Sequence, residues 1–164
     1  MTSELLILLH FAASAYLAGL IWVIQLVHYP MLADLDPQRA AAACARHAYA
    51  ITPIVVPAML IELAAVVLML PPVRMVEGIG QPAGSVVPWL WVSLALVIVV
   101  WVSTFAVQVP LHTRLQKHAP GTIDADGVRL LVRTNWIRTV CWSARAVLAG
   151  WFVLELVRPS VTRG

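Results

Sequence analysis

Four long runs of apolar residues, each interrupted by only a few polar side chains, account for most of the chain. They cover about residues 5–29, 37–70, 87–112 and 123–157. Each run contains the roughly 20 residues that an α-helix needs to cross about 30 Å of hydrocarbon. The pattern therefore predicts an all-α fold, an antiparallel four-helix transmembrane bundle built from a single domain of residues 1–164.

Prolines and glycines mark where the predicted helices end. Pro30 ends the first run, and the glycine- and proline-rich segment from Pro71 to Pro88 predicts an irregular loop. Asp36 followed by Pro37 is typical of a helix N-terminus, because aspartate caps the helix and proline is tolerated in its first turn. We therefore expect the second helix to begin near Pro37.

Composition supports a membrane protein. Hydrophobic residues make up 61% of the 164 residues and charged residues 12%, against about 45–50% and about 25% in soluble domains. The mean hydropathy is +0.86. A soluble chain of this size has too much surface for its volume to hide so many apolar side chains. The expected partner is the lipid bilayer, and the sequence holds no nucleic-acid-binding motif.

The distribution of basic residues predicts the orientation of the bundle. The first and third connections and the adjacent helix ends hold Arg39, Arg46, Arg114, Lys117, Arg129 and Arg133, whereas the opposite side holds Arg74, Arg158 and Arg163. By the positive-inside rule these two connections are cytoplasmic and both chain termini are not. The N-terminal Met-Thr-Ser-Glu lacks the positive charge of a secretory signal, so the first run is expected to be retained. The expected location is the plasma membrane of a bacterium.

Polar side chains inside the apolar runs are the candidates for function, because an ionisable group in hydrocarbon is costly and normally faces the bundle interior. On the fourth helix Asn135, Arg138, Trp142 and Arg145 follow one another at spacings that place them on one face. The residues expected to converge near the cytoplasmic end are Gln25, His28, His47, Gln108, His112, Asn135 and Arg138. Glu62 and Arg145 lie deeper and are expected to be a supporting ion pair.

This residue set allows metal chemistry. Histidines from three helices, His28, His47 and His112, could bind a transition metal such as iron or copper. Gln25, Gln108 and Asn135 would then orient the imidazole rings. A haem held by His28 and His112 is a less favoured alternative, because no haem or di-iron motif is present.

The same residues allow chemistry without a metal. The histidines could act as acids and bases near neutral pH, while Arg138 stabilises an enolate or phenolate oxygen. Structural interpretations also remain open: the histidines could cap helix ends, and Glu62 with Arg145 could serve packing alone.

Two stretches between Phe105 and Arg145, FAVQVPLHTRLQ and LVRTNWIRTVCWSAR, carry a family resemblance. They resemble the anthrone-oxygenase-like family of small four-helix membrane proteins, whose third helix has the motif N-V-P-x-N-x-x-L and whose fourth has W-x-x-W/F-N-x-x-R-T. The corresponding residues are Gln108-Val109-Pro110-Leu111-His112 and Asn135-Trp136-Ile137-Arg138-Thr139. Gln108 and His112 replace the two asparagines of the first motif. The resemblance implies oxidation of an aromatic or polyketide-like phenol, without the need for a classical cofactor.

The sequence thus predicts a membrane oxidoreductase, metal-dependent or not, that acts on a small hydrophobic or aromatic substrate near the cytoplasmic end of the bundle. The catalytic residues would be Gln25, Gln108, Asn135 and Arg138, beside the three histidines. The alternative is a non-enzymatic protein, either a proton-coupled carrier of small molecules or an accessory subunit of a membrane complex. A homo-oligomer is compatible with each of these functions.

Overall fold

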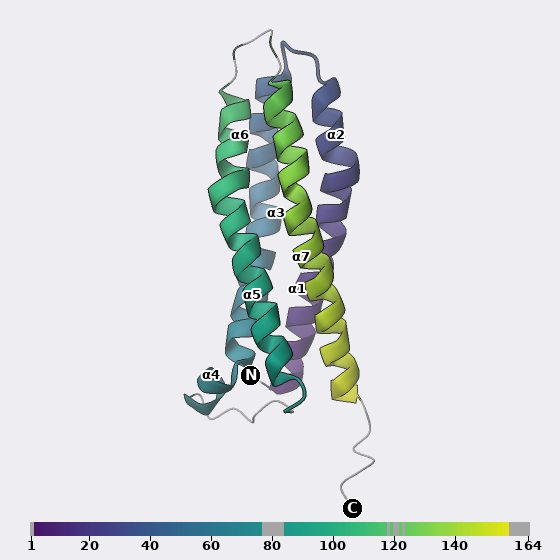
Figure 1. Ribbon diagram of the computed structural model, residues 1–164, viewed down its shortest axis with the longest axis vertical. Coiled ribbons are helices and arrows are strands. Elements are labelled where there is room, and N and C mark those ends of the chain that lie inside the picture. The colour runs from purple at the N-terminus through teal and green to yellow at the C-terminus, as the bar shows by residue number, and fades with distance from the viewer. Residues whose placement is uncertain (1, 77–83, 118, 120–121, 123, 158–164) are drawn as a thin grey trace, which may run out of the picture.

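All regular structure in the described part of the chain is helical. The computed structural model (Figure 1) describes every residue except 1, 77–83, 118, 120–121, 123 and 158–164. In chain order the elements are α1 (Ser3–Val23), the π-helical turn η1 (Ile24–His28), α2 (Tyr29–Met31), the 3-10 turn η2 (Leu32–Asp34), α3 (Ala40–Met69), α4 (Pro71–Val76), α5 (Val87–Ser103), the π-helical turn η3 (Thr104–Gln108), α6 (Val109–Gln116) and α7 (Ala125–Val157).

These elements form four continuous helical stretches that are long and apolar enough to cross a membrane: Ser3–Met31, Ala40–Met69, Val87–Gln116 and Ala125–Val157. The prediction of an all-α chain with four helices long and apolar enough to cross a membrane is therefore confirmed. Helices suit this environment because they satisfy their backbone hydrogen bonds internally. Figure 1 shows the four stretches side by side along the long axis, with the start of α1 and the end of α7 at its lower end and α2 and α6 at its upper end.

Three predicted boundaries differ from the structure. The third helical stretch continues to Gln116 instead of ending at about residue 112. The second long helix begins at Ala40, because Asp36 forms a turn instead of a cap: its carboxylate accepts a hydrogen bond from the Gln38 amide at 3.0 Å and its carbonyl accepts one from Arg39. The segment expected to be an irregular loop begins with the helix α4, because proline is favoured in the first turn of a helix. Residues 77–83, the centre of that expected loop, lie outside the described residues.

The two π-helical turns are the features of the fold that matter most for the site. Each ends two residues before a proline: η1 ends at His28 before Pro30, and η3 ends at Gln108 before Pro110. A proline ring displaces the carbonyl four residues earlier and cannot donate to it, and a wider turn accommodates this defect within a continuous helix. The widened turns rotate Gln25 and Gln108 into the buried interior.

Candidate functional site

Three histidines from different spans meet near the upper end of the bundle. His28 of η1 stacks on His47 of α3, with ring centroids 3.9 Å apart and planes inclined by 23°. His47 in turn lies 5.7 Å from His112 of α6, centroid to centroid. We call His28, His47 and His112, together with Tyr29, the histidine cluster. The structure thus brings the three expected histidines together.

Tyr29 joins this cluster from the end of the first span. Its hydroxyl lies 3.0 Å from His112 Nε2, within hydrogen-bond distance, and only 2% of the residue is exposed. Its ring also lies beside His28 and His47, with centroid distances of 6.0 Å and 6.4 Å. Arg138 interacts with the same Tyr29 side chain from α7. Tyr29 therefore connects the histidines to the polar face of α7.

An amide network positions that polar face. The Asn135 amide donates to Gln25 Oε1 at 2.8 Å, and the Gln25 amide donates to the Val132 carbonyl at 3.1 Å. Arg138 donates to Asn135 Oδ1 at 3.4 Å, and its guanidinium lies 4.9 Å from the centre of the Trp142 ring. Gln25 and Asn135 are almost fully buried, so they have no water to replace these bonds. Gln25 therefore positions Asn135, which in turn restrains the guanidinium of Arg138.

A cavity of about 510 Å³ opens beside the histidine cluster. Its inner wall is formed by Tyr29, His47, Gln108, His112 and Arg138. Its outer wall is apolar, and the residues there also face outward from the bundle, with 41–59% of their surface exposed. These outer residues are Val56, Leu60, Phe105 and Val109. We call this space the histidine cavity; it has one polar wall and one wall that borders the lipid-facing surface.

Four buried polar atoms of residues that line this cavity lack a hydrogen-bond partner among the residues that the structure describes. They are Trp101 Nε1, Gln108 Oε1, His112 Nδ1 and Arg138 Nε. Buried polar atoms are normally paired, because an unpaired one loses its hydration without compensation. All four atoms are buried, so the side chains that carry them would have to turn before a bound molecule with acceptors and a donor could pair with them. The cavity is therefore suited to a ligand with polar oxygens on an apolar body.

A second polar network lies further along the bundle and contains the expected ion pair. Arg145 Nε donates to Glu62 Oε1 at 2.7 Å, and both side chains are fully buried. Glu62 also accepts hydrogen bonds from Ser14 at 2.8 Å and from the indole of Trp142 at 3.1 Å. Arg145 further donates to the carbonyl and the hydroxyl of Ser93. We call Ser14, Glu62, Ser93, Trp142 and Arg145 the ion-pair network; its residues come from all four spans.

Trp142 connects the two regions. Its indole nitrogen contacts Glu62, while its ring faces the Arg138 guanidinium. The Glu62 carboxylate is thus held by three donors from the ion-pair network. Beyond this network, His10 Nε2 lies 3.3 Å from the Ser93 hydroxyl.

The histidines present two buried nitrogens that could bind a metal, His28 Nε2 and His112 Nδ1, neither of which has a partner among the described residues. Among the residues that the structure describes, no group of three or more His, Cys, Asp or Glu side chains has the geometry of a metal site. Two imidazoles stacked 3.9 Å apart direct their nitrogens side by side rather than toward one point. Metal binding would therefore require the His28 or His47 ring to rotate.

Sequence reasoning missed Tyr29 and Trp101 as site residues. Tyr29 precedes Pro30 at the end of a span, where an aromatic residue is typical of the membrane interface. One signal could have identified it. In His28-Tyr29-Pro30 the proline follows two residues after the polar residue that ends the first π-helical turn, and Gln108-Val109-Pro110 has the same arrangement at the end of the second. Trp101 carries no signal that separates it from the other tryptophans of the chain.

Comparison of the chain with protein-family models, with curated proteins and with solved structures finds no match.

Proposed function

We propose that this chain is an integral membrane oxidoreductase that binds a small hydrophobic aromatic molecule in the histidine cavity and oxidises it with dioxygen. The observation that carries the proposal is the set of four unpartnered polar atoms in residues that line a cavity with one polar and one apolar wall. Aromatic hydroxyketones carry this combination: carbonyl oxygens that accept, a hydroxyl that donates, and a flat apolar body. The resemblance of the third and fourth spans to the anthrone-oxygenase-like family favours the same substrate class.

The chemistry follows from which atoms are available. Arg138 Nε and Trp101 Nε1 can donate to a substrate carbonyl oxygen, and Gln108 Oε1 can accept from a hydroxyl. In the tautomer in which His112 Nε2 donates to the Tyr29 oxygen, His112 Nδ1 is free to accept a proton from the substrate. The Arg138 guanidinium then stabilises the enolate oxygen that forms. Asn135 and Gln25 act as positioning residues, because they restrain Arg138.

The overall reaction balances with dioxygen as the oxidant. The ring methylene opposite the carbonyl, which is conjugated with it through the flanking aromatic rings, loses one proton to His112. The resulting enolate reacts at this carbon with dioxygen to form a carbon–oxygen bond, and the hydroperoxide takes the proton back from His112. Loss of water then leaves a second carbonyl, so that one methylene and one dioxygen give one carbonyl and one water. Iron or copper held by His28, His47 and His112 is the metal-dependent form of this proposal, and it requires the ring rotation described above.

We further propose that the bundle is antiparallel, that both termini lie on the non-cytoplasmic side of a bacterial plasma membrane, and that the histidine cavity lies at the cytoplasmic end. The order of contacts between spans supports the antiparallel arrangement. Ser14 and His28 of the first span meet Glu62 and His47 of the second, so residue numbers rise on one and fall on the other. The excess of arginine and lysine in the first and third connections supports the orientation.

The test is oxidation of a hydroxyanthrone by the purified protein in lipid nanodiscs. The reaction is monitored through oxygen consumption and through the absorbance of the quinone product. His112→Gln is expected to lower the rate by about a hundredfold or more, since a positioned base contributes this much. Arg39→Gln is the matched control, because Arg39 is exposed and does not line the cavity. Absence of oxidation by the wild-type protein, or equal rates for wild type and His112→Gln, would contradict the proposal.

A proton-coupled carrier is the second candidate, favoured by the buried polar side chains that extend from His10 through Ser93 and Arg145 to Glu62. Intramembrane carboxylates and histidines are typical of proton relays. In that case proteoliposomes take up the aromatic molecule along a proton gradient without oxidising it, and Glu62→Gln abolishes uptake. Binding with neither oxidation nor uptake would instead favour an accessory subunit of a larger membrane complex.

A further inference from the structure

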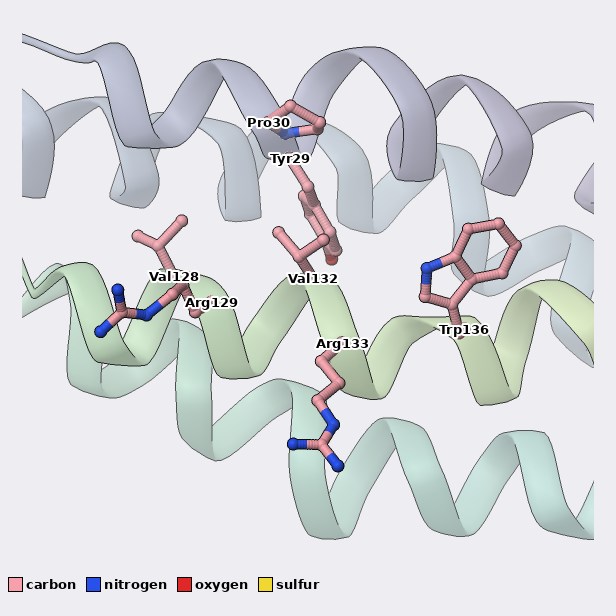
Figure 2. Close-up of a pocket in the computed structure, with 7 residues that line it drawn as sticks. All are labelled: Tyr29, Pro30, Val128, Arg129, Val132, Arg133 and Trp136. Atoms are coloured by element: carbon pink, nitrogen blue, oxygen red, sulfur yellow. The ribbon is translucent and has the colours of Figure 1, made fainter.

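A second cavity also borders Tyr29, between α2 and α7. It has a volume of about 350 Å³ and is lined by Tyr29, Pro30, Val128, Val132 and Trp136, together with the side chains of Arg129 and Arg133. Figure 2 shows the Tyr29 ring extending from α2 toward Val132 of α7, with Trp136 at one end of the space and Val128 at the other. We call this space the α2–α7 groove.

The groove has an apolar floor and cationic margins. In Figure 2 the guanidinium groups of Arg129 and Arg133 point away from Tyr29, so the aliphatic part of each side chain borders the groove and the charge lies outside it. The Arg129 side chain extends toward the start of α7, whereas the Arg133 side chain extends across the helix axis; a long arginine side chain can turn its charge toward the headgroup layer from either position. An occupant of the groove therefore needs an apolar portion and a negative charge at its edge.

The two arginines differ in what already neutralises them. Arg129 forms a surface ion pair with Asp126, one turn earlier on α7. Arg133 is exposed, and no hydrogen bond or ion pair involves its side chain in the described part of the chain. Arg133 also lies within the fourth span, eight residues or about 12 Å beyond the start of α7. A cation at this depth without an acidic neighbour is available to an anion in the headgroup layer.

We propose that the α2–α7 groove binds one anionic phospholipid, with its phosphate at Arg133 and Arg129 and an acyl chain along Val132 toward Trp136. The order of the residues fits this orientation. Arg129 lies four residues after the start of α7 and Trp136 eleven residues after it, so Arg129 is nearer the membrane surface and Trp136 nearer its interior. The lipid is a structural partner, and the proposal does not depend on the oxidation of any substrate.

The proposed lipid also adjoins the histidine cluster through one residue. Tyr29 lines both the α2–α7 groove and the histidine cavity, and its hydroxyl contacts His112. A lipid chain in the groove would pack against Tyr29, the residue whose hydroxyl contacts His112.

Spin-labelled phospholipids test this site directly. The protein is reconstituted in neutral phosphatidylcholine with trace spin-labelled phosphatidylglycerol or phosphatidylcholine, and the immobilised fraction is measured by electron paramagnetic resonance. Wild type is expected to prefer phosphatidylglycerol. Arg133→Gln is expected to weaken that preference about fivefold, as for one arginine near an anionic headgroup, and Val132→Phe, which fills the floor without changing charge, is expected to remove the immobilised lipid.

Arg39→Gln is the control for net charge, since Arg39 is an exposed arginine of the first connection and does not line the groove. It is expected to leave the preference unchanged. Equal immobilisation of the two lipids by wild type, or equal effects of Arg133→Gln and Arg39→Gln, would overturn the proposal. Loss of the preference on adding millimolar inorganic phosphate, with Val132→Phe behaving as wild type, would show a simple anion site and would also overturn it.

Discussion

The buried ion pair between Glu62 and Arg145 makes a strong prediction about stability. Glu62→Gln keeps the shape of the side chain but removes its charge and one of its acceptor atoms. In the native protein both carboxylate oxygens accept, one from Arg145 and Ser14 and the other from the Trp142 indole. A glutamine offers one oxygen and one NH₂ group. The NH₂ group would therefore face either the Trp142 indole or the donors Arg145 and Ser14, all of which need an acceptor.

The expected loss in the free energy of unfolding depends on the Arg145 charge, which remains buried after Glu62→Gln. Breaking a buried pair while leaving its partner charged costs about 3–5 kcal/mol, or between two and four orders of magnitude in the unfolding equilibrium. Single hydrogen bonds within a membrane average only about 0.6 kcal/mol. Ser14→Ala, which removes one hydrogen bond from the same carboxylate, is therefore the matched control. It should cost several times less than Glu62→Gln.

Equilibrium unfolding in mixed micelles, with increasing dodecyl sulfate and followed by circular dichroism, measures these differences. The double variant Glu62→Leu/Arg145→Met removes both charges and is expected to be more stable than Glu62→Gln, because no buried charge remains without a partner. If Glu62→Gln costs no more than Ser14→Ala, the pair does not carry the energy assigned to it. A double variant less stable than Glu62→Gln would refute the same reasoning.

Three further predictions follow from individual contacts. Tyr29→Phe removes the hydroxyl that contacts His112 and is expected to lower the free energy of unfolding by about 0.6 kcal/mol in the same assay, the average for one hydrogen bond within a membrane. Gly127→Ala is expected to lower the free energy of unfolding by about 1 kcal/mol, although alanine favours helices. The reason is that the alanine Cβ would lie 2.5 Å from the Asp124 carboxylate, which caps α7. An increase in stability would contradict this prediction. A cysteine at Lys117 in a cysteine-free background is expected to be labelled by impermeant thiol reagents only from the cytoplasmic side, and labelling of intact cells would reverse the proposed orientation.

The sequence was sufficient for the four spans because the membrane leaves the chain few options. A run of apolar residues in lipid must satisfy its own backbone hydrogen bonds, and this alone requires a helix. The helix ends were harder to predict, because they depend on local competition. Asp36 bonds the amide two residues later rather than capping a helix, and an Asp-Pro pair is compatible with either outcome.

The candidate site was predictable where helical spacing decides which residues share a face. Asn135, Arg138 and Arg145 lie on the same side of α7 for this reason, and Glu62 and Arg145 lie 2.7 Å apart as expected of charges that avoid lipid. The participation of Tyr29 was not predictable from spacing. The direction of the Tyr29 side chain depends on the π-helical turn η1, which directly precedes it. A π-helical turn has more residues per turn than an α-helix, so a period of 3.6 residues does not give the face on which Tyr29 lies.

The two polar regions differ in how completely their hydrogen bonds are satisfied: among the described residues, the ion-pair network leaves one buried atom, Arg145 Nη2, without a partner. The difference supports the function proposed for the histidine cavity. The Glu62 carboxylate has three donors and lines neither of the two cavities, as expected of a network that fixes the relative positions of the spans. Beside the histidine cavity, four polar atoms on four elements remain without a partner in the described part of the chain. A chain selected for packing alone would replace Gln108 and Arg138 with apolar residues of similar volume, which often costs nothing or stabilises the fold. Their retention beside a cavity is accounted for by a ligand that supplies the missing partners.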